Sequence, residues 1–293
     1  MTGSMVYKSN ALIEAAYRLS VHEQRIVLSA ISQVRRGETV TDEVLYSVSA
    51  GDISRLSGIA IDDAYGKLKD AALRLKRREV RLTEEPSGRK KPSVMVTGWV
   101  QTIIYRGGEG RVELRFTKDM LPYLTELKEQ FTKYALSDVA KMDSAYAIRL
   151  YELLMQWGST GQREISLEDF RRILQLEERY PAIRDLKRWV LEPAIDQINE
   201  HSPLSVTWKQ RKTGRRVTHL SFTFEPKNKK LKQPKQPKLP KTQAEMAKLA
   251  LPGESWEQLR IRLQTKTEAA AMKSEDMKRR EELENRGQQR LVG

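Results

Sequence analysis

The chain has no cysteine among its 293 residues and only three histidines, His22, His201 and His219. A disulfide framework and a thiolate metal site are therefore excluded, and no two histidines stand at metal-ligand spacing. No apolar run approaches the ~18 residues of a membrane span, and the N-terminus lacks the charged-then-apolar order of a signal peptide. We expect a cytoplasmic protein with no metal, no other cofactor and no membrane partner.

Catalytic motifs are also missing. The sequence contains no G-x-x-x-x-G-K-[ST] phosphate-binding loop, because its glycine-rich segment Gly107–Gly110 continues into alternating strand residues. The His-x-His site of a rolling-circle nicking enzyme is absent, and no tyrosine has a metal or base beside it that would make it a DNA-cleaving nucleophile. We therefore expect that the protein is not an enzyme.

Positive charge is what the chain has in excess. It contains 53 Lys and Arg against 39 Asp and Glu, which gives a formal net charge of +14 and a pI near 9.8. Such an excess favours a polyanionic partner, nucleic acid above all. After residue 226 there are 17 basic and 9 acidic residues, so the first 226 residues hold 36 and 30. This globular part is only mildly basic, and it can bind DNA only if its charge is concentrated in patches.

Residues 1–130 are predicted to form a winged helix. Ser20 and Glu23 make a capping box ahead of a helix with apolar residues at helical spacing. A short strand over 44–48, a short helix over 51–56 and a longer helix over 62–77 follow. Alternating runs at 80–83, 94–104 and 112–116 then indicate strands, and the first hairpin has a basic tip at 89–91.

Residues 131–226 repeat this order. We expect a helix over 136–157, a strand over 164–166, a short helix capped by Ser166 and a long helix over 183–199. A hairpin of strands 204–208 and 217–224 closes the unit around a basic turn, 209–216. Two short segments have similar sequences and begin 117 positions apart, namely Ser49–Ile53 and Ser166–Phe170. The fold class is therefore predicted as α+β, with two tandem winged-helix domains.

A basic tail, 227–293, follows the two domains. Its first part interleaves proline with lysine, which predicts an extended and solvated linker. Its second part is highly charged and poor in apolar residues, so we expect it to be disordered or conditionally helical.

The long helix of the second domain and its hairpin are the main DNA-reading candidate. The outer face of the helix carries three basic residues, Arg184, Lys187 and Arg188. Its inner face carries Ile183, Leu186 and Val190, with Trp189 close by. Arginine on such a helix can donate two hydrogen bonds to guanine in the major groove. The hairpin is expected to reach the flanking phosphates with Lys209, Arg211, Lys212, Arg215 and Arg216.

The long helix of the first domain gives a weaker signal. Its basic residues Lys67, Lys69, Arg74 and Arg77 are diluted by aspartates at positions 62, 63 and 70. We expect this helix to contact phosphate rather than read bases, and a purely structural role stays open.

Four segments resemble one family. Lys8–Leu12 and Leu19–Arg25 are similar to the opening of iteron-type plasmid replication initiators, the initiator replication protein family. Ser144–Leu154 resembles the family's S-x-Y-[AS]-x-R-[LI]-Y-E-L-L helix, and Leu191–Asn199 resembles its L-x-P-A-x-x-x-I-N helix end. The resemblance covers residues 6–225. It also explains Pro193, which is otherwise awkward within a helix because proline lacks a backbone donor.

The resemblance implies a function that periodicity cannot give. It implies a DNA-binding initiator that binds direct repeats (iterons) in a plasmid origin and opens a neighbouring A·T-rich region. It also implies recruitment of the host initiator and replicative helicase, with chaperones as further candidate partners. A monomer would initiate, and a homodimer would repress its own gene at an inverted repeat. The alternatives are a transcriptional repressor built from the same domains and a nicking nuclease.

The strand predicted over 94–104 is the candidate dimer contact of the first domain. Strict alternation would hide Val94 and Val96 and leave Trp99 and Ile103 on the opposite face, where a partner subunit or the second domain would cover them. The alternative is that Trp99 packs on the helices of its own domain.

Overall fold

The computed structural model describes residues 4–35, 40–84, 93–125, 130–227, 255–259 and 262. The described residues up to 227 form one compact unit. The predicted basic tip at 89–91 and nearly all of the predicted tail lie outside the described residues.

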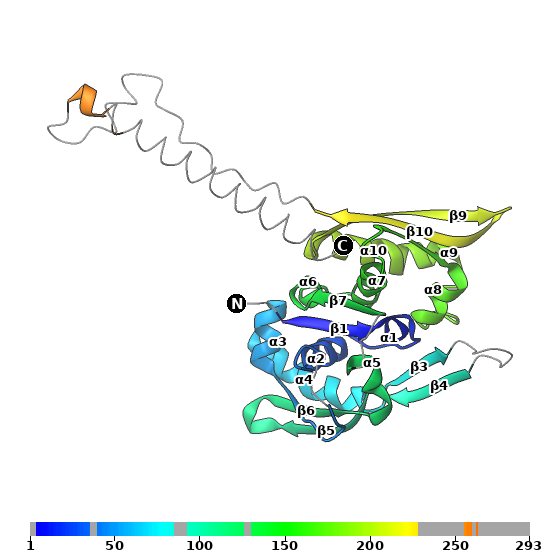
Figure 1. Cartoon of the computed structure of the whole chain (residues 1–293), viewed down its shortest axis with the longest axis horizontal. Helices are drawn as coiled ribbons and strands as arrows, with labels where there is room; N and C mark the ends of the chain where they lie inside the picture. The colour runs from blue at the N-terminus through cyan, green and yellow to red at the C-terminus, as the bar shows by residue number, and fades with distance from the viewer. Residues whose placement is uncertain are drawn as a thin grey trace. The chain divides into compact units, whose positions relative to one another are not determined.

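In the first part of the compact unit a short strand precedes each of two pairs of helices, and a run of strands follows (Figure 1). Its elements, in order, are β1 (Met5–Ser9), α1 (Asn10–Glu14), α2 (Val21–Ile31), β2 (Tyr46–Ser49), α3 (Ala50–Ser57), α4 (Ile61–Leu75), β3 (Glu79–Glu84), β4 (Ser93–Gly98), β5 (Val100–Arg106), β6 (Arg111–Phe116) and α5 (Pro122–Thr125). Strands β2, β6 and β5 form one antiparallel sheet, and β3 pairs with β4 in a separate hairpin.

The second part repeats the helix-helix-hairpin order. Its elements are β7 (Phe131–Ala135), α6 (Ser137–Ala140), α7 (Ala145–Met155), β8 (Gln162–Ser166), α8 (Leu167–Ile173), α9 (Ile183–Leu186), a π-helical turn (Lys187–Leu191), α10 (Glu192–His201), β9 (Leu204–Thr213) and β10 (Arg216–Pro226). Strands β8, β10 and β9 form a three-stranded antiparallel sheet. The α+β fold of two winged helices is confirmed.

Three serines begin helices, two of them, Ser20 and Ser166, as the sequence predicts. The Ser20 hydroxyl accepts a hydrogen bond from the Glu23 backbone amide, and the Glu23 carboxylate accepts one from the Ser20 amide. Ser49 and Ser166 cap α3 and α8 in the same way, each accepting from the amide three residues later at 3.0 Å. The shared cap supports the comparison of the two halves, because it places a short helix after a short strand in each.

Strand β1 pairs with β7 across the boundary predicted at residues 130/131. The pair is antiparallel, from Met5 opposite Ala135 to Ser9 opposite Phe131. Figure 1 places this pair between α4 on one side and α10 on the other. The division into domains 1–130 and 131–226 stays a prediction.

The helix predicted over 136–157 is wrong as one continuous element. It is divided into α6 and α7, and the Ser144 hydroxyl caps α7 by accepting from the Ala147 amide. The Gln197 side-chain oxygen also accepts from the amides of Asp143 and Ser144. These bonds satisfy helix-start donors that would otherwise lack partners, and so they stabilise the break.

The strand predicted over 94–104 is also divided, and its sides are reversed. Val94 and Val96 are 59 % and 53 % exposed, whereas Trp99 is fully buried and Ile103 is partly buried. The chain leaves β4, which pairs with β3, and enters β5, which pairs with β6, at Trp99. Because the chain changes sheet there, alternation does not continue through this residue. Trp99 packs edge-on against Tyr17, in the segment between α1 and α2, at 4.9 Å, so residues of the first 130 cover its ring.

Candidate nucleic-acid interface

The loop between α8 and α9 fixes where the basic helix of the second domain begins. The Arg171 guanidinium donates to four carbonyl oxygens of this loop, those of Leu176 (3.1 Å), Arg179 (2.9 Å), Tyr180 (2.7 Å) and Pro181 (3.2 Å). Gln175 and Tyr180 have φ of 51°, a left-handed backbone conformation that residues other than glycine rarely adopt. One side chain therefore holds a loop whose backbone is unfavourable by itself.

Replacing Arg171 with alanine is expected to lower the free energy of unfolding by about 1–3 kcal/mol, because the loop carbonyls lose their charged donor. Arg171→Lys should recover only part of this, since one ammonium cannot span four carbonyls. The matched control is Arg172→Ala, which removes one exposed ion pair, to Asp169 at 3.0 Å, and should change stability by under about 1 kcal/mol. Chemical denaturation measures all three, and equal losses for Arg171→Ala and Arg172→Ala would contradict the role given to Arg171.

Three predicted basic residues lie on the outer side of the helix that follows, where Arg184 and Arg188 are exposed and Lys187 is partly buried. Arg184 is exposed and pairs with its neighbour Asp185 at 3.3 Å. The Lys187 ammonium lies 5.4 Å from the Trp208 ring of β9, and the Arg188 guanidinium lies 5.0 Å from the Trp189 ring. Leu186 and Val190, on the other side, are buried, while Ile183 is only partly buried. The positions of the three basic residues are therefore as the sequence predicts.

Trp189 does not lie near the buried side of the helix, where the sequence pattern places it. It is 57 % exposed, and it lies in the π-helical turn Lys187–Leu191. The sequence pattern does not predict this turn. The one local hint is Pro193, which lies two residues beyond the turn and lacks a backbone donor.

The hairpin of the second domain is longer than predicted and its turn is shorter. Strand β9 continues to Thr213, which pairs with Arg216, so only Gly214 and Arg215 connect the strands. Gly214 has φ of 61°, a conformation that glycine adopts at low cost. The prediction of one basic turn over 209–216 is wrong, because most of these residues belong to strands.

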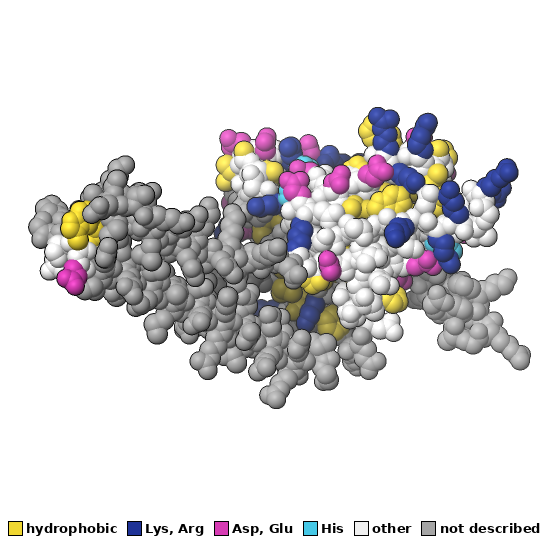
Figure 2. Space-filling view, turned by 90° about the horizontal axis from the view of Figure 1, so that it is seen from above, with side chains coloured by type: hydrophobic (Ala, Val, Ile, Leu, Met, Phe, Trp, Pro, Cys, Tyr) yellow, Lys and Arg dark blue, Asp and Glu magenta, His cyan; other side chains and the backbone are white. Residues whose placement is uncertain are grey.

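Strand geometry divides the hairpin's positive charges between two faces. Lys209 and Arg211 lie on one face and Lys212 on the other, because successive side chains of a strand alternate. Arg211 pairs with Glu164 of β8 at 3.1 Å. The turn residue Arg215 and its neighbour Arg216 are exposed. Figure 2 shows Lys and Arg side chains gathered at one end of the molecular surface in view. Figure 1 places α9 and the tip of the hairpin at this end.

The predicted basic residues of the first domain are exposed along α4. Lys67, Lys69 and Arg77 are exposed, and the Lys69 ammonium lies 5.7 Å from the Tyr105 ring. Arg74 pairs at 3.5 Å with Glu23, a buried carboxylate that also pairs with Arg78. The inner residues predicted for this helix are buried, namely Ala64, Leu68, Ala72 and Leu75.

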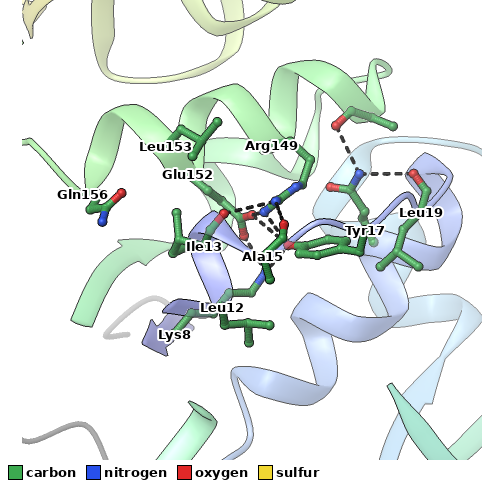
Figure 3. A network of polar contacts seen from close by, with 12 residues as sticks. Lys8, Leu12, Ile13, Ala15, Tyr17, Leu19, Arg149, Glu152, Leu153 and Gln156 are labelled. Carbon is green, nitrogen blue, oxygen red and sulfur yellow. Dashed lines mark hydrogen bonds and ion pairs between the residues drawn. The ribbon is translucent and has the colours of Figure 1, made fainter. Parts of the chain in front are cut away.

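Sequence reasoning missed a buried polar network between β1 and α7 (Figure 3). The Glu152 carboxylate accepts from Lys8 Nζ (2.6 Å), Tyr134 (2.6 Å), Arg149 (3.0 Å) and Tyr17 (3.3 Å). The other Arg149 nitrogen donates to the carbonyl oxygens of residues 13 and 15. Lys8, Arg149 and Glu152 belong to the motifs that carry the family resemblance, so that part of the resemblance reflects packing rather than a binding surface.

The electrostatics of this network follow from burial and pairing. Burial alone would raise the pKa of Glu152, but the positive charges of Lys8 and Arg149 hold it below its ordinary value. Burial lowers the pKa of Lys8, although Glu152 opposes the shift. Burial also raises the pKa values of Tyr17 and Tyr134, so both hydroxyls remain protonated donors.

Within the described ranges, no three His, Asp or Glu side chains lie together as metal ligands. None of the helices in those ranges is both long enough and apolar enough to cross a bilayer.

Comparison with known proteins agrees with this arrangement. Residues 5–155 match the family model described as "Initiator Replication protein, WH1", and residues 166–224 match "Initiator Rep protein, WH2". The first match therefore extends past residue 130, to the end of α7.

Similar proteins are known from Escherichia coli. A "Replication initiation protein" is 28 % identical over 233 residues, which cover 77 % of this chain and 71 % of that one. The "PI protein" is 23 % identical over 245 residues, 73 % of this chain and 80 % of that one. A solved structure, "Crystal structure of Pi initiator protein in complex with iteron DNA", superposes with a TM-score of 0.66 at 21 % identity, covering 78 % of this chain and 99 % of that one. With both of its winged-helix domains matched, the chain belongs to the initiator replication protein family.

Proposed function

We propose that this protein initiates plasmid replication by binding direct repeats in the origin. The observation that carries the proposal is the outer face of Arg184, Lys187 and Arg188 beside a long basic hairpin, in a member of the initiator family. Family membership favours an initiator over a protein that only represses transcription. The related Pi protein was crystallised with iteron DNA, which supports direct repeats as the target.

We assign different contacts to the two domains. The helix α9–α10 of the second domain reads base edges in the major groove, where arginine recognises guanine by two hydrogen bonds. The hairpin β9–β10 contacts phosphates beside that groove with Lys209, Arg211, Lys212, Arg215 and Arg216. In the first domain, α4 contacts phosphate with Lys67, Lys69, Arg74 and Arg77. We assign it no base reading, because Asp62 and Asp63 dilute the positive charge of its first turn.

Removing charge from the hairpin should flatten the salt dependence of DNA binding. We expect the log–log slope of affinity against salt to fall by about 0.9 for each lost phosphate contact. The variant is Lys212→Gln with Arg215→Gln and Arg216→Gln, and the measurement is a titration at several salt concentrations. Lys133→Gln removes an exposed charge from β7 and should leave the slope unchanged. A triple variant with the slope of the unaltered protein would exclude this hairpin from the phosphate contacts.

Assembly is proposed to switch between two states. A monomer binds the direct repeats, opens the adjacent A·T-rich DNA and recruits the host initiator and replicative helicase, with chaperones as further candidate partners. A homodimer binds an inverted repeat and represses the gene. The protein acts in the cytoplasm, without catalysis and without a cofactor.

The dimer contact is reassigned to the exposed side of β4. Val94 and Val96 are exposed apolar side chains on the same face of β4, which pairs with β3. We expect Val94→Ser with Val96→Ser to lower the dimer fraction in sedimentation while repeat binding is kept, because burying these valines on dimerisation stabilises the dimer. Val44→Ser, at another exposed valine, is the control. An unchanged dimer fraction in the folded double variant would remove β4 from the interface.

Supercoiled origin DNA tests the proposed function against the nuclease alternative. An initiator should leave the covalent strands intact and sensitise the A·T-rich region to a single-strand probe. Relaxation of the plasmid by the purified protein would contradict the proposal.

A further inference from the structure

A large aromatic side chain lies in the middle of the proposed reading surface. Trp189 is 57 % exposed, and the Arg188 guanidinium lies 5.0 Å from its ring. Arg184 is exposed five residues earlier on the same helix, which is about 1.4 turns at 3.6 residues per turn. This position combines an apolar surface with two positive charges, whereas phosphate contacts alone would need only the charges.

The π-helical turn gives a local cause for this exposure. The Glu192 amide donates to the Lys187 carbonyl, five residues back rather than four. In a regular α-helix that buries Leu186 and Val190, Leu191 would point outward. Here Val190 and Leu191 are both buried, because the wider turn admits both to the core. Trp189, which precedes them, remains outside, and π-turns of this kind occur frequently at functional sites.

Trp189 lines a groove that arginine side chains of the first domain also line. Trp189 and Leu174 of the second domain line a groove of about 610 Å³ together with Arg18, Ser20 and Arg78 of the first. Asp143 also lines the groove, where it pairs with Arg25 at 3.1 Å. Arg18 is exposed, whereas Arg78 is partly buried and pairs with Glu23 at 3.1 Å. An apolar ring beside an exposed arginine fits a ligand that is both anionic and locally apolar. Duplex DNA has this combination in the major groove wherever a thymine methyl lies between two phosphate backbones.

We propose that Trp189 recognises thymine in the bound site by contact with the C5-methyl group. The inference rests on the proposed function, because it requires that α9–α10 enter the major groove. Within that groove, thymine is the base that presents an apolar group, and an apolar side chain discriminates it without a hydrogen bond. Arg184 and Arg188 then contact neighbouring base pairs or phosphates. Trp189 adds a preference for thymine at a base pair that neither arginine reads.

The test uses the full chain and a duplex selected by it from a random pool. Each thymine of the selected duplex is replaced in turn by deoxyuridine, which removes the methyl and preserves base pairing. We expect binding by the unaltered protein to weaken about fourfold at the contacted position, as for exposing one buried methyl-sized group. Trp189→Ala should bind the thymine and uracil duplexes equally, and Trp189→Phe should keep a reduced preference. The matched control is Trp157→Ala, a 45 % exposed tryptophan outside this helix, which should respond to uracil as the unaltered protein does.

The outcomes separate this inference from the function on which it rests. If no sequence is selected, the proposed function fails and the inference fails with it. If a sequence is selected but no uracil substitution weakens binding, or Trp189→Ala keeps the full uracil response, the function stands and the thymine contact is refuted. A Trp189→Ala variant that loses affinity only for single-stranded oligonucleotides would instead indicate stacking on unpaired bases, and it would overturn the proposal.

Discussion

Replacing Glu152 with glutamine should lower the free energy of unfolding by about 3–5 kcal/mol, the largest stability change that we expect from one substitution. The reason is that this carboxylate is the shared partner of two buried cations, Lys8 and Arg149, at 2.6 and 3.0 Å. Glutamine keeps the shape of the side chain but leaves both charges without a counterion in a site closed to water. Denaturant unfolding followed by circular dichroism measures the change.

A second substitution tests that explanation directly. Lys8→Met in the Glu152→Gln background removes one of the two uncompensated cations, so the double variant should be more stable than Glu152→Gln alone. Glu79→Gln, which breaks an exposed pair with Arg81 at 3.9 Å, should change stability by under about 1 kcal/mol. A Glu152→Gln variant as stable as Glu79→Gln would show that the network contributes little.

The same network should make the free energy of unfolding depend on pH. The pKa of Glu152 lies below its ordinary value in the folded chain, so its stabilising effect is present above the unfolded-state pKa. That effect is lost as the pH falls through the folded-state pKa.

Alanine substitutions at Arg184, Lys187 and Arg188 should weaken binding to the cognate repeat by about 1–3 kcal/mol at each position that contacts a base. Binding to random duplex DNA should change much less, because phosphate contacts elsewhere remain. Each variant is titrated against both duplexes at one salt concentration. Lys133→Ala, which lies on β7, is the control and should affect neither. Equal weakening on cognate and random DNA for all three variants would rule out base reading by this helix.

The sequence predicted the parts of the fold that local chemistry determines. The capping serines Ser20 and Ser166 are predictable because a side-chain acceptor three residues before a free amide is a local signal. The faces of α4 and of α9–α10 were identifiable because apolar residues recur at helical spacing.

The errors come from tertiary contacts that no local window contains. Strict alternation puts Val94 and Val96 inside and Trp99 outside, which is wrong because the chain changes sheet at Trp99. The break before Ser144 depends on Gln197, which is more than fifty residues away. Lys8, Arg149 and Glu152 were seen as motif residues, but their common buried site depends on the packing of β1 against α7.

The measurement that tests the central claim most directly is a nuclease footprint of the full chain on the plasmid's own origin and promoter DNA. We predict protection of each copy of a direct repeat at physiological salt, with affinity at least about 10³-fold above that for random duplex. Protection should persist in the Val94→Ser, Val96→Ser variant and be lost when Arg184, Lys187 and Arg188 are all replaced by alanine. Protection confined to an inverted repeat, or uniform coating with no preferred sequence, would contradict the account.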